Sequence, residues 1–94
     1  MEFEWDRAKR EQNIRSHGVD FTEAEKTFED RHAFFQFDGR HSLAEDRFFL
    51  LGKTRTGQLL MTVFTLRGVK IRIISSRRAS RQEATGYEER IRLQ

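Results

Sequence analysis

The chain contains no cysteine and no proline, and each absence excludes a class of site or structure. Without cysteine there can be no disulfide, no thiolate metal site and no thiol nucleophile. A small domain without disulfides is typical of a reducing compartment, so we expect a cytoplasmic protein. Without proline, the ends of helices and strands must be set by glycine and by capping side chains.

Long apolar runs are missing as well. None approaches the roughly 20 residues that a membrane span needs, so we expect no membrane partner. The first five residues, Met-Glu-Phe-Glu-Trp, lack both the basic segment and the apolar core of a signal peptide. The motifs of an activated serine, a phosphate-binding loop and a dinucleotide-binding loop are also absent. His32 and His41 have no partner at metal-ligand spacing, and we expect neither a metal nor a cofactor.

The 94 residues are enough for one domain, residues 1–94, with a modest core built on nine phenylalanines. The charge is uneven along the chain. Residues 1–47 hold 8 Lys and Arg against 12 Asp and Glu, a net charge of −4, whereas residues 48–94 hold 10 against 3, a net charge of +7. This cationic half predicts a phosphate-rich partner, and the alternative is a solvated surface rich in arginine.

Capping signals predict three helices. A side-chain oxygen before each helix can accept hydrogen bonds from the free amides of the first turn, and Gly18 fits the left-handed residue that ends the first helix. Glu83 completes a capping box with Ser80, and Tyr87 is expected to pack the last helix onto a sheet. The expected helices are residues 7–17 after Asp6, a short helix to about residue 28 after Asp20 or Thr22, and residues 81–92 after Ser80.

Between the helices the apolar pattern has the period of two that is typical of strands. Short turns join consecutive strands and predict a four-stranded antiparallel meander, which with helices at both ends gives an α+β fold. The alternation at residues 3–5 is compatible with a short extra strand. The four expected strands are residues 33–38, 47–53, 59–66 and 69–76.

The last expected strand is the most informative. Alternation assigns Val69, Ile71 and Ile73 to the core. Guanidinium groups bind phosphate through paired hydrogen bonds, so the opposite face predicts a phosphate site, although a half-exposed strand with ordinary polar residues is the alternative. That opposite face is expected to carry Lys70, Arg72, Ile74 and Ser76, and Arg77, Arg78 and Arg81 follow it.

Two groups are candidates for proton transfer. His17 stands at a helix end, where an imidazole either interacts with the helix dipole or serves as acid or base, because an unperturbed imidazole titrates near neutrality. Glu45 and Arg47 are two residues apart and share a face if both are extended, as a structural ion pair or as part of a site. Histidine, carboxylates and cations suffice to cleave RNA, because the 2′-hydroxyl of the substrate is itself the nucleophile.

Residues spread over nearly the whole chain follow one pattern: Phe3, Trp5, Asp6, Lys9, Asn13, His17, Gly18, Val19, Phe21, Ala24, Phe28, Asp30, Glu45, Arg47, Gly52, Thr65, Arg67, Arg72, Ile73, Ile74, Ser75, Arg77, Ala79, Glu83 and Tyr87. In this pattern the chain resembles the BrnT toxins. The resemblance implies a RelE-like α+β fold and a ribonuclease that arrests translation. It also implies neutralisation by a BrnA-like ribbon-helix-helix antitoxin, through which alone operator DNA would be bound. Two positions depart from the family pattern: Arg15-Ser16 precede His17, where Lys is frequent, and Ser76 replaces Ala.

The resulting hypothesis is a metal-independent endoribonuclease. Arg72 and Arg77, with Arg47 as a third candidate, would stabilise the phosphate in the transition state, and His17 or Glu45 would be acid or base. Further cations would bind the RNA backbone away from the cleaved bond: Arg67, Lys70, Arg78 and Arg81.

Two other classes of protein remain open. The first is a non-catalytic module that binds nucleic acid, in which Phe35 and Phe37, on one strand face, would stack on bases. The interpretation that we favour for these two rings is packing against a helix. The second is a structural partner that is stable only in a complex.

Overall fold

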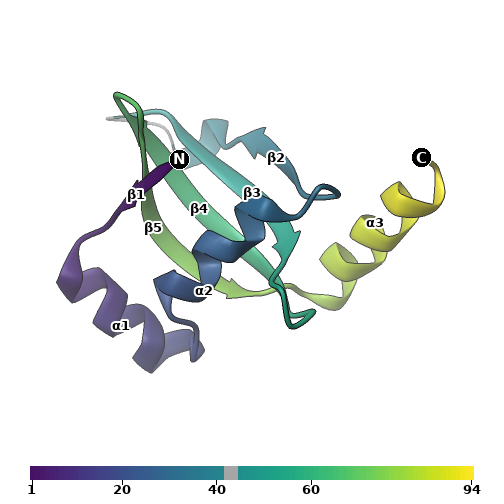
Figure 1. Ribbon diagram of the computed structural model, residues 1–94, viewed down its shortest axis with the longest axis horizontal. Helices are drawn as coiled ribbons and strands as arrows, with labels where there is room; N and C mark the ends of the chain where they lie inside the picture. Colours follow the sequence, from purple (N-terminus) through teal and green to yellow (C-terminus); the bar gives the residue numbers. More distant parts are fainter. Residues whose placement is uncertain (42–44) are drawn as a thin grey trace.

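The computed structural model describes residues 1–41 and 45–94 (Figure 1). Among these residues, no helix has the length and the apolar character of a membrane span. Two short 3₁₀ turns, η1 (Thr27–Glu29) and η2 (Gly39–His41), flank the second strand. The remaining elements are β1 (Glu2–Glu4), α1 (Arg7–His17), α2 (Phe21–Lys26), β2 (Phe34–Phe37), β3 (Arg47–Lys53), β4 (Leu59–Arg67), β5 (Lys70–Arg78) and α3 (Arg81–Arg92).

The strands form one mixed sheet of five, in the order β1-β5-β4-β3-β2. The α+β class is confirmed, and β2 to β5 pair antiparallel in sequence order, but the sheet as a whole is mixed and has a fifth strand. The short N-terminal strand belongs to the sheet, and it pairs parallel to β5 with Phe3 opposite Ile71. Local turn signals predict pairing between consecutive strands, whereas β1 and β5 lie at opposite ends of the chain and no turn connects them.

The predicted caps are present. Asp6 accepts from the amide of Ala8, and Gly18 ends α1 with a φ of 67°. Asp20 with Glu23, and Ser80 with Glu83, form capping boxes at the starts of α2 and α3. These local signals set the ends of the helices. They therefore determine the positions of His17 at the end of α1 and of Glu83 at the start of α3.

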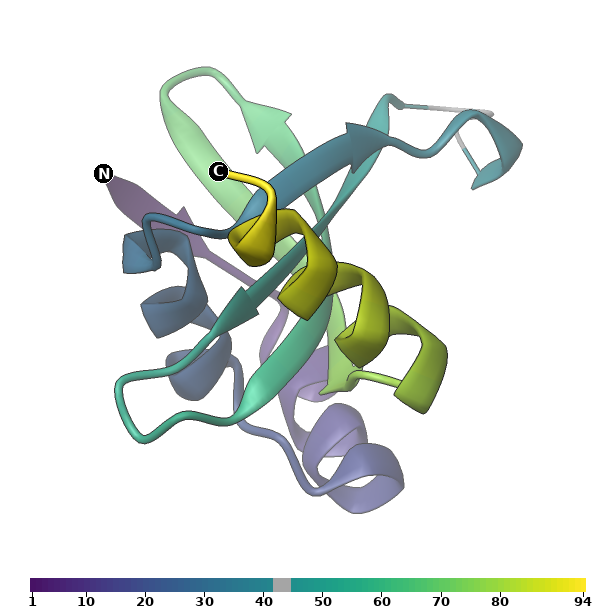
Figure 2. The same cartoon turned by 90° about the vertical axis from the view of Figure 1, so that its right-hand side faces the viewer.

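The two faces of the sheet differ in character. The core face carries Phe48, Leu50, Phe64, Ile71 and Ile73, which pack with Phe28 or with the buried residues of α2. The opposite surface is here called the arginine face. Figure 2 shows α3 in front of the sheet and α1 and α2 behind it. Residues of the arginine face, identified by strand register, are Arg47, Phe49, Met61, Val63, Thr65, Lys70, Arg72, Ser75 and Arg77.

A bulge in β5 determines which side chains share the arginine face. Val63 pairs with Ser75 but Phe64 pairs with Ile73, so Ile74 is the extra residue and alternation shifts by one position. The prediction that Ser76 points outward with Arg72 is therefore wrong. Ser76 is 1% exposed, and its hydroxyl lies 2.9 Å from the hydroxyl of Thr62 on the core face. The same shift moves Arg77 onto the face of Arg72.

Beyond the end of β1, a side chain from α1 takes the place of a neighbouring strand. The amide of Asn13 donates to the carbonyl of Ser76 at 2.7 Å and accepts from the Ser76 amide at 3.0 Å. It also donates to the carbonyl of Val19, and it is 5% exposed. This buried amide holds α1 against the edge of β5, so the end of that helix lies next to the arginine face.

Candidate active site

A hollow of about 440 Å³ opens on the arginine face, between the end of α1 and the start of α3. Its apolar part consists of Phe49, Met61 and Val63 from the neighbouring strands β3 and β4. Its polar part mixes an imidazole, two carboxylates, one hydroxyl and one guanidinium, from His17, Asp38, Ser75, Arg77 and Glu83. Ser76 also borders the hollow, but its hydroxyl points to the core face.

Arg77 is held at the hollow by α3. Its two terminal nitrogens donate to the two carboxylate oxygens of Glu83, at 2.9 and 3.0 Å. The same carboxylate accepts from the Ser80 amide at 2.8 Å, so the capping box fixes the carboxylate and the carboxylate orients the guanidinium. The hydrogen bonds that Arg77 donates to Glu83 lower the pKa of Glu83 and raise the pKa of Arg77, so the pair stays ionised near neutrality.

Arg72 lies on the same face but does not line the hollow. Its guanidinium donates to Glu4 of β1 at 2.7 Å, and both side chains are 29% exposed. Strand register places Thr65 beside Arg72 and Arg47 beside Thr65, so the two arginines belong to one row across the sheet. Arg72 and Arg77 are two such rows apart, which is about 13 Å along the strand.

The structure brings some of the predicted residues together and separates others. His17 lines the hollow with Arg77. Glu45 lies outside the residues that line it, where its carboxylate accepts from Arg67 at 3.1 Å. Lys70 pairs with Arg67 in the hairpin beyond Arg72.

Arg78 and Arg81 lie apart from these groups. Arg78 pairs with the buried Leu60 and so points to the core-face side of β5, and Arg81 is exposed at the first position of α3. Of the predicted catalytic residues, His17 and Arg77 are thus the two that line the hollow.

Sequence reasoning missed three contributors to the hollow. Glu83 was identified only as a helix cap, although its spacing of six residues from Arg77 follows the same helix start that the capping box predicts. From the sequence, Asp38 is the last residue of one expected strand and Phe49 lies within the next. No local signal identifies these two, because the register of β2, β3 and β4 is what places them at the hollow.

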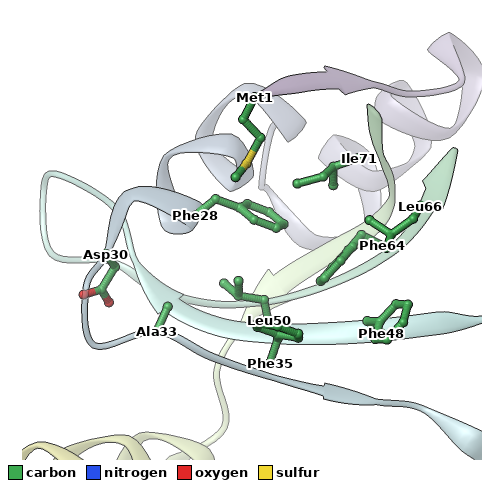
Figure 3. A pocket seen from close by; sticks show the side chains of 10 residues that line it. All are labelled: Met1, Phe28, Asp30, Ala33, Phe35, Phe48, Leu50, Phe64, Leu66 and Ile71. Carbon is green, nitrogen blue, oxygen red and sulfur yellow. The ribbon is translucent and has the colours of Figure 1, made fainter. Parts of the chain in front are cut away.

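A second cavity, an apolar groove of about 340 Å³, lies on the core face beyond η1 (Figure 3). Phe35 and Phe37 extend along this side of β2, and the favoured interpretation that a helix covers them is wrong, since they are 65% and 50% exposed. Their rings contact the sheet residues Phe64 and Phe48 instead, because α2 and η1 cover only part of the core face. The groove is lined by Met1, Phe28, Asp30, Ala33, Phe35, Phe48, Leu50, Phe64, Leu66 and Ile71.

α3 is anchored through Asp30, which also lines the apolar groove. Tyr87 packs this helix onto the sheet as predicted, at 2% exposure, and its hydroxyl donates to Asp30 at 2.6 Å. Burial and this carboxylate raise the pKa of Tyr87, so the phenol stays protonated at neutral pH. Within residues 1–41 and 45–94, no group of three or more His, Asp or Glu side chains is arranged to hold a metal ion.

Comparison with known proteins identifies a family. Residues 5–83 match the model of the ribonuclease toxin BrnT of type II toxin–antitoxin systems. The fold is similar to the crystal structure of the Brucella abortus ribonuclease toxin BrnT, with a TM-score of 0.67 and 27% identity, over 86% of this chain and 99% of that chain. No curated protein sequence matches the chain. Because the family model spans most of the sequence, the chain belongs to the BrnT family of ribonuclease toxins of type II toxin–antitoxin systems.

Proposed function

We propose that the protein is an endoribonuclease that cleaves RNA at the hollow of the arginine face without a metal ion. The observation that carries the proposal is the meeting of His17, Arg77 and the carboxylate of Glu83 around one accessible hollow. A guanidinium there stabilises negative charge on phosphorus, and an imidazole transfers protons near neutral pH.

In this mechanism the 2′-hydroxyl of the RNA loses its proton to a base and attacks the adjacent phosphorus. Arg77 stabilises the pentacoordinate phosphate, and the departing 5′-oxygen takes up a proton. The products are a 2′,3′-cyclic phosphate and a 5′-hydroxyl. His17 is preferred over Glu45 for proton transfer, because His17 lines the hollow whereas Glu45 pairs with Arg67 outside it.

Arg72 and Arg47 are assigned to the phosphate next to the cleaved one, since their row lies on the same face beyond the hollow. Arg67 and Lys70 continue this line of cations toward the hairpin. Arg78 and Arg81 lie outside it, so their predicted contacts with the RNA backbone would be to more distant phosphates. Each backbone contact that is lost should reduce the salt dependence of binding by about one unit of slope.

The cellular role follows from the family. We propose that cleavage arrests translation in the cytoplasm and that a BrnA-like ribbon-helix-helix antitoxin neutralises the toxin and carries the contact with operator DNA. The fold would be a variant of the RelE-like toxins. A short neighbouring gene for a ribbon-helix-helix protein, and growth arrest that its co-expression relieves, would support this pairing.

The test is single-turnover cleavage of a model RNA in EDTA by the purified chain. Wild type should yield ends with a 2′,3′-cyclic phosphate, and Arg77→Ala and His17→Ala should each slow cleavage about 100-fold or more. Arg55→Ala is the matched control, because this exposed arginine of the β3–β4 turn pairs with Glu29 of η1 and does not line the hollow. Loss of wild-type cleavage in EDTA would refute the metal-free mechanism, and unchanged rates in both variants would refute their roles.

The same experiment tests the alternative, a module that binds nucleic acid without cutting it. In that alternative, bases of the nucleic acid stack on Phe35 and Phe37 while the cations bind its phosphates. Both rings are exposed, but they lie on the core face, opposite Arg72 and Arg77. The base-stacking version of the alternative therefore loses its support.

A further inference from the structure

Phe49 differs from the other phenylalanines of this chain in its surroundings. Of the nine phenylalanines, eight contact another aromatic ring or a guanidinium within the described residues. Phe49 alone has no such contact in that part of the chain, and its ring instead lines the hollow on the arginine face. An aromatic ring at an open polar site offers a flat surface on which another ring can stack.

Phe49 lies between arginines, so its ring surface is flanked by groups that can bind phosphate. Register places Phe49, Val63 and Ser75 in one row across the sheet. The row of Arg47 and Arg72 lies on one side of it and Arg77 lies on the other, each about 7 Å away along the strand. An apolar surface flanked by guanidinium groups matches a nucleotide, whose flat base is joined to anionic phosphates.

We propose that the hollow binds one unpaired base of the RNA on the ring of Phe49, with the phosphates on either side of this nucleotide held by Arg72 and Arg77. The inference rests on the proposed function and adds that the substrate is single-stranded RNA. A base inside a duplex is stacked on both sides and paired at its edge, so its face is not available to a protein ring. The hollow of about 440 Å³ lies between α1 and α3 and has room for one base, not for a helix of RNA.

The test separates binding from cleavage. The probe is a short oligonucleotide in which every ribose carries a 2′-O-methyl group, which removes the nucleophile, and it is used alone and annealed to its complement. Binding to the purified full chain is measured by fluorescence anisotropy at fixed salt. We expect the single strand to bind at least 10-fold more tightly than the duplex, and Phe49→Leu to weaken single-strand binding about 10-fold.

Two further variants make the result specific. Phe49→Tyr keeps the flat ring and should retain binding within about twofold, whereas Phe35→Leu, the same change on the core face, should leave binding unaltered. With cleavable RNA, Phe49→Leu should raise KM more than it lowers kcat. Thermal unfolding of each variant checks that the fold is retained.

Several outcomes would overturn the inference: equal affinity for single strand and duplex, no binding of either, unchanged binding by Phe49→Leu, or equal losses in Phe49→Leu and Phe35→Leu. The proposed nuclease fails separately. If the single strand binds through Phe49 while the wild type cleaves no RNA, the base site stands and the catalytic proposal is wrong. If the wild type cuts RNA but binds duplex and single strand equally well, the catalytic proposal stands and the base site is wrong.

Discussion

The two faces of one sheet use the same strands for different purposes. On the core face the rings contact one another, with Phe64 at 5.1 Å from Phe28 and 5.6 Å from Phe48 between ring centroids. On the arginine face, Arg72 and Arg77 pair with carboxylates and the ring of Phe49 lies open to the hollow. Because neighbouring residues of a strand point to opposite faces, one position along β4 or β5 separates a residue that stabilises the fold from one at the site.

The largest expected difference between the two faces is in the free energy of unfolding, and it is tested at two adjacent positions of β4. Phe64→Ala should lower the free energy of unfolding by about 3–5 kcal/mol, because the ring is 5% exposed and packs against three other phenylalanines. Val63→Ala, on the arginine face, should cost about 1 kcal/mol. Denaturant titration measures both values. Equal losses of stability at the two positions would mean that the core face does not contribute more to stability than the arginine face.

Asn13 connects the two faces at the edge of β5, and its loss should have the next largest effect. Asn13→Ala leaves the amide and the carbonyl of Ser76 without their buried partners, which should cost about 2 kcal/mol. Gln12→Ala, one residue earlier and exposed, is the control. Because α1 carries His17 to the hollow, Asn13→Ala should also slow RNA cleavage in protein that is still folded. Unchanged stability would show that water replaces the amide.

The difference between the faces also explains which parts of the molecule the sequence predicts. Caps such as Asp6, Ser80 and Gly18 depend on residues within one turn, so the helices follow from local chemistry. The pairing of β1 with β5, and the bulge at Ile74, depend on contacts between distant segments. The sequence therefore singles out Arg77, which lines the hollow, whereas the register that brings Phe49 and Asp38 there requires the fold.

The ion pair of Arg10 and Asp20 is bidentate like that of Arg77 and Glu83, but it does not line the hollow, so the pH dependence of its stability gives a comparison with the site. Arg10 donates to both carboxylate oxygens of Asp20 at 2.8 Å and joins the two N-terminal helices, and this hydrogen bond lowers the pKa of Asp20 to about 2. A depressed folded-state pKa contributes stability above the unfolded value, near 3.8, and that stability is lost as the pH falls toward 2.

Arg10→Gln should lower the stability at pH 7 only slightly, because solvent screens this exposed pair, and should flatten the decline between pH 4 and pH 2. Thermal unfolding across this range measures it. RNA cleavage at neutral pH should be unchanged, in contrast to Arg77→Ala. A loss of cleavage in Arg10→Gln would mean that the helix pair acts on the site.

The smallest expected change in stability is at Glu83, where it separates a structural role from a functional one. Glu83→Gln should alter the free energy of unfolding by only about 0.5 kcal/mol, because glutamine also closes a capping box with Ser80. The charge that orients Arg77 is nevertheless lost, so single-turnover cleavage should fall even though α3 remains in place. Ser80→Ala should do the opposite: it costs about 1 kcal/mol through the cap but leaves the ion pair and the cleavage rate near wild type. If both variants lose stability and activity in proportion, Glu83 serves the helix alone, and Arg77 does not depend on it for its orientation.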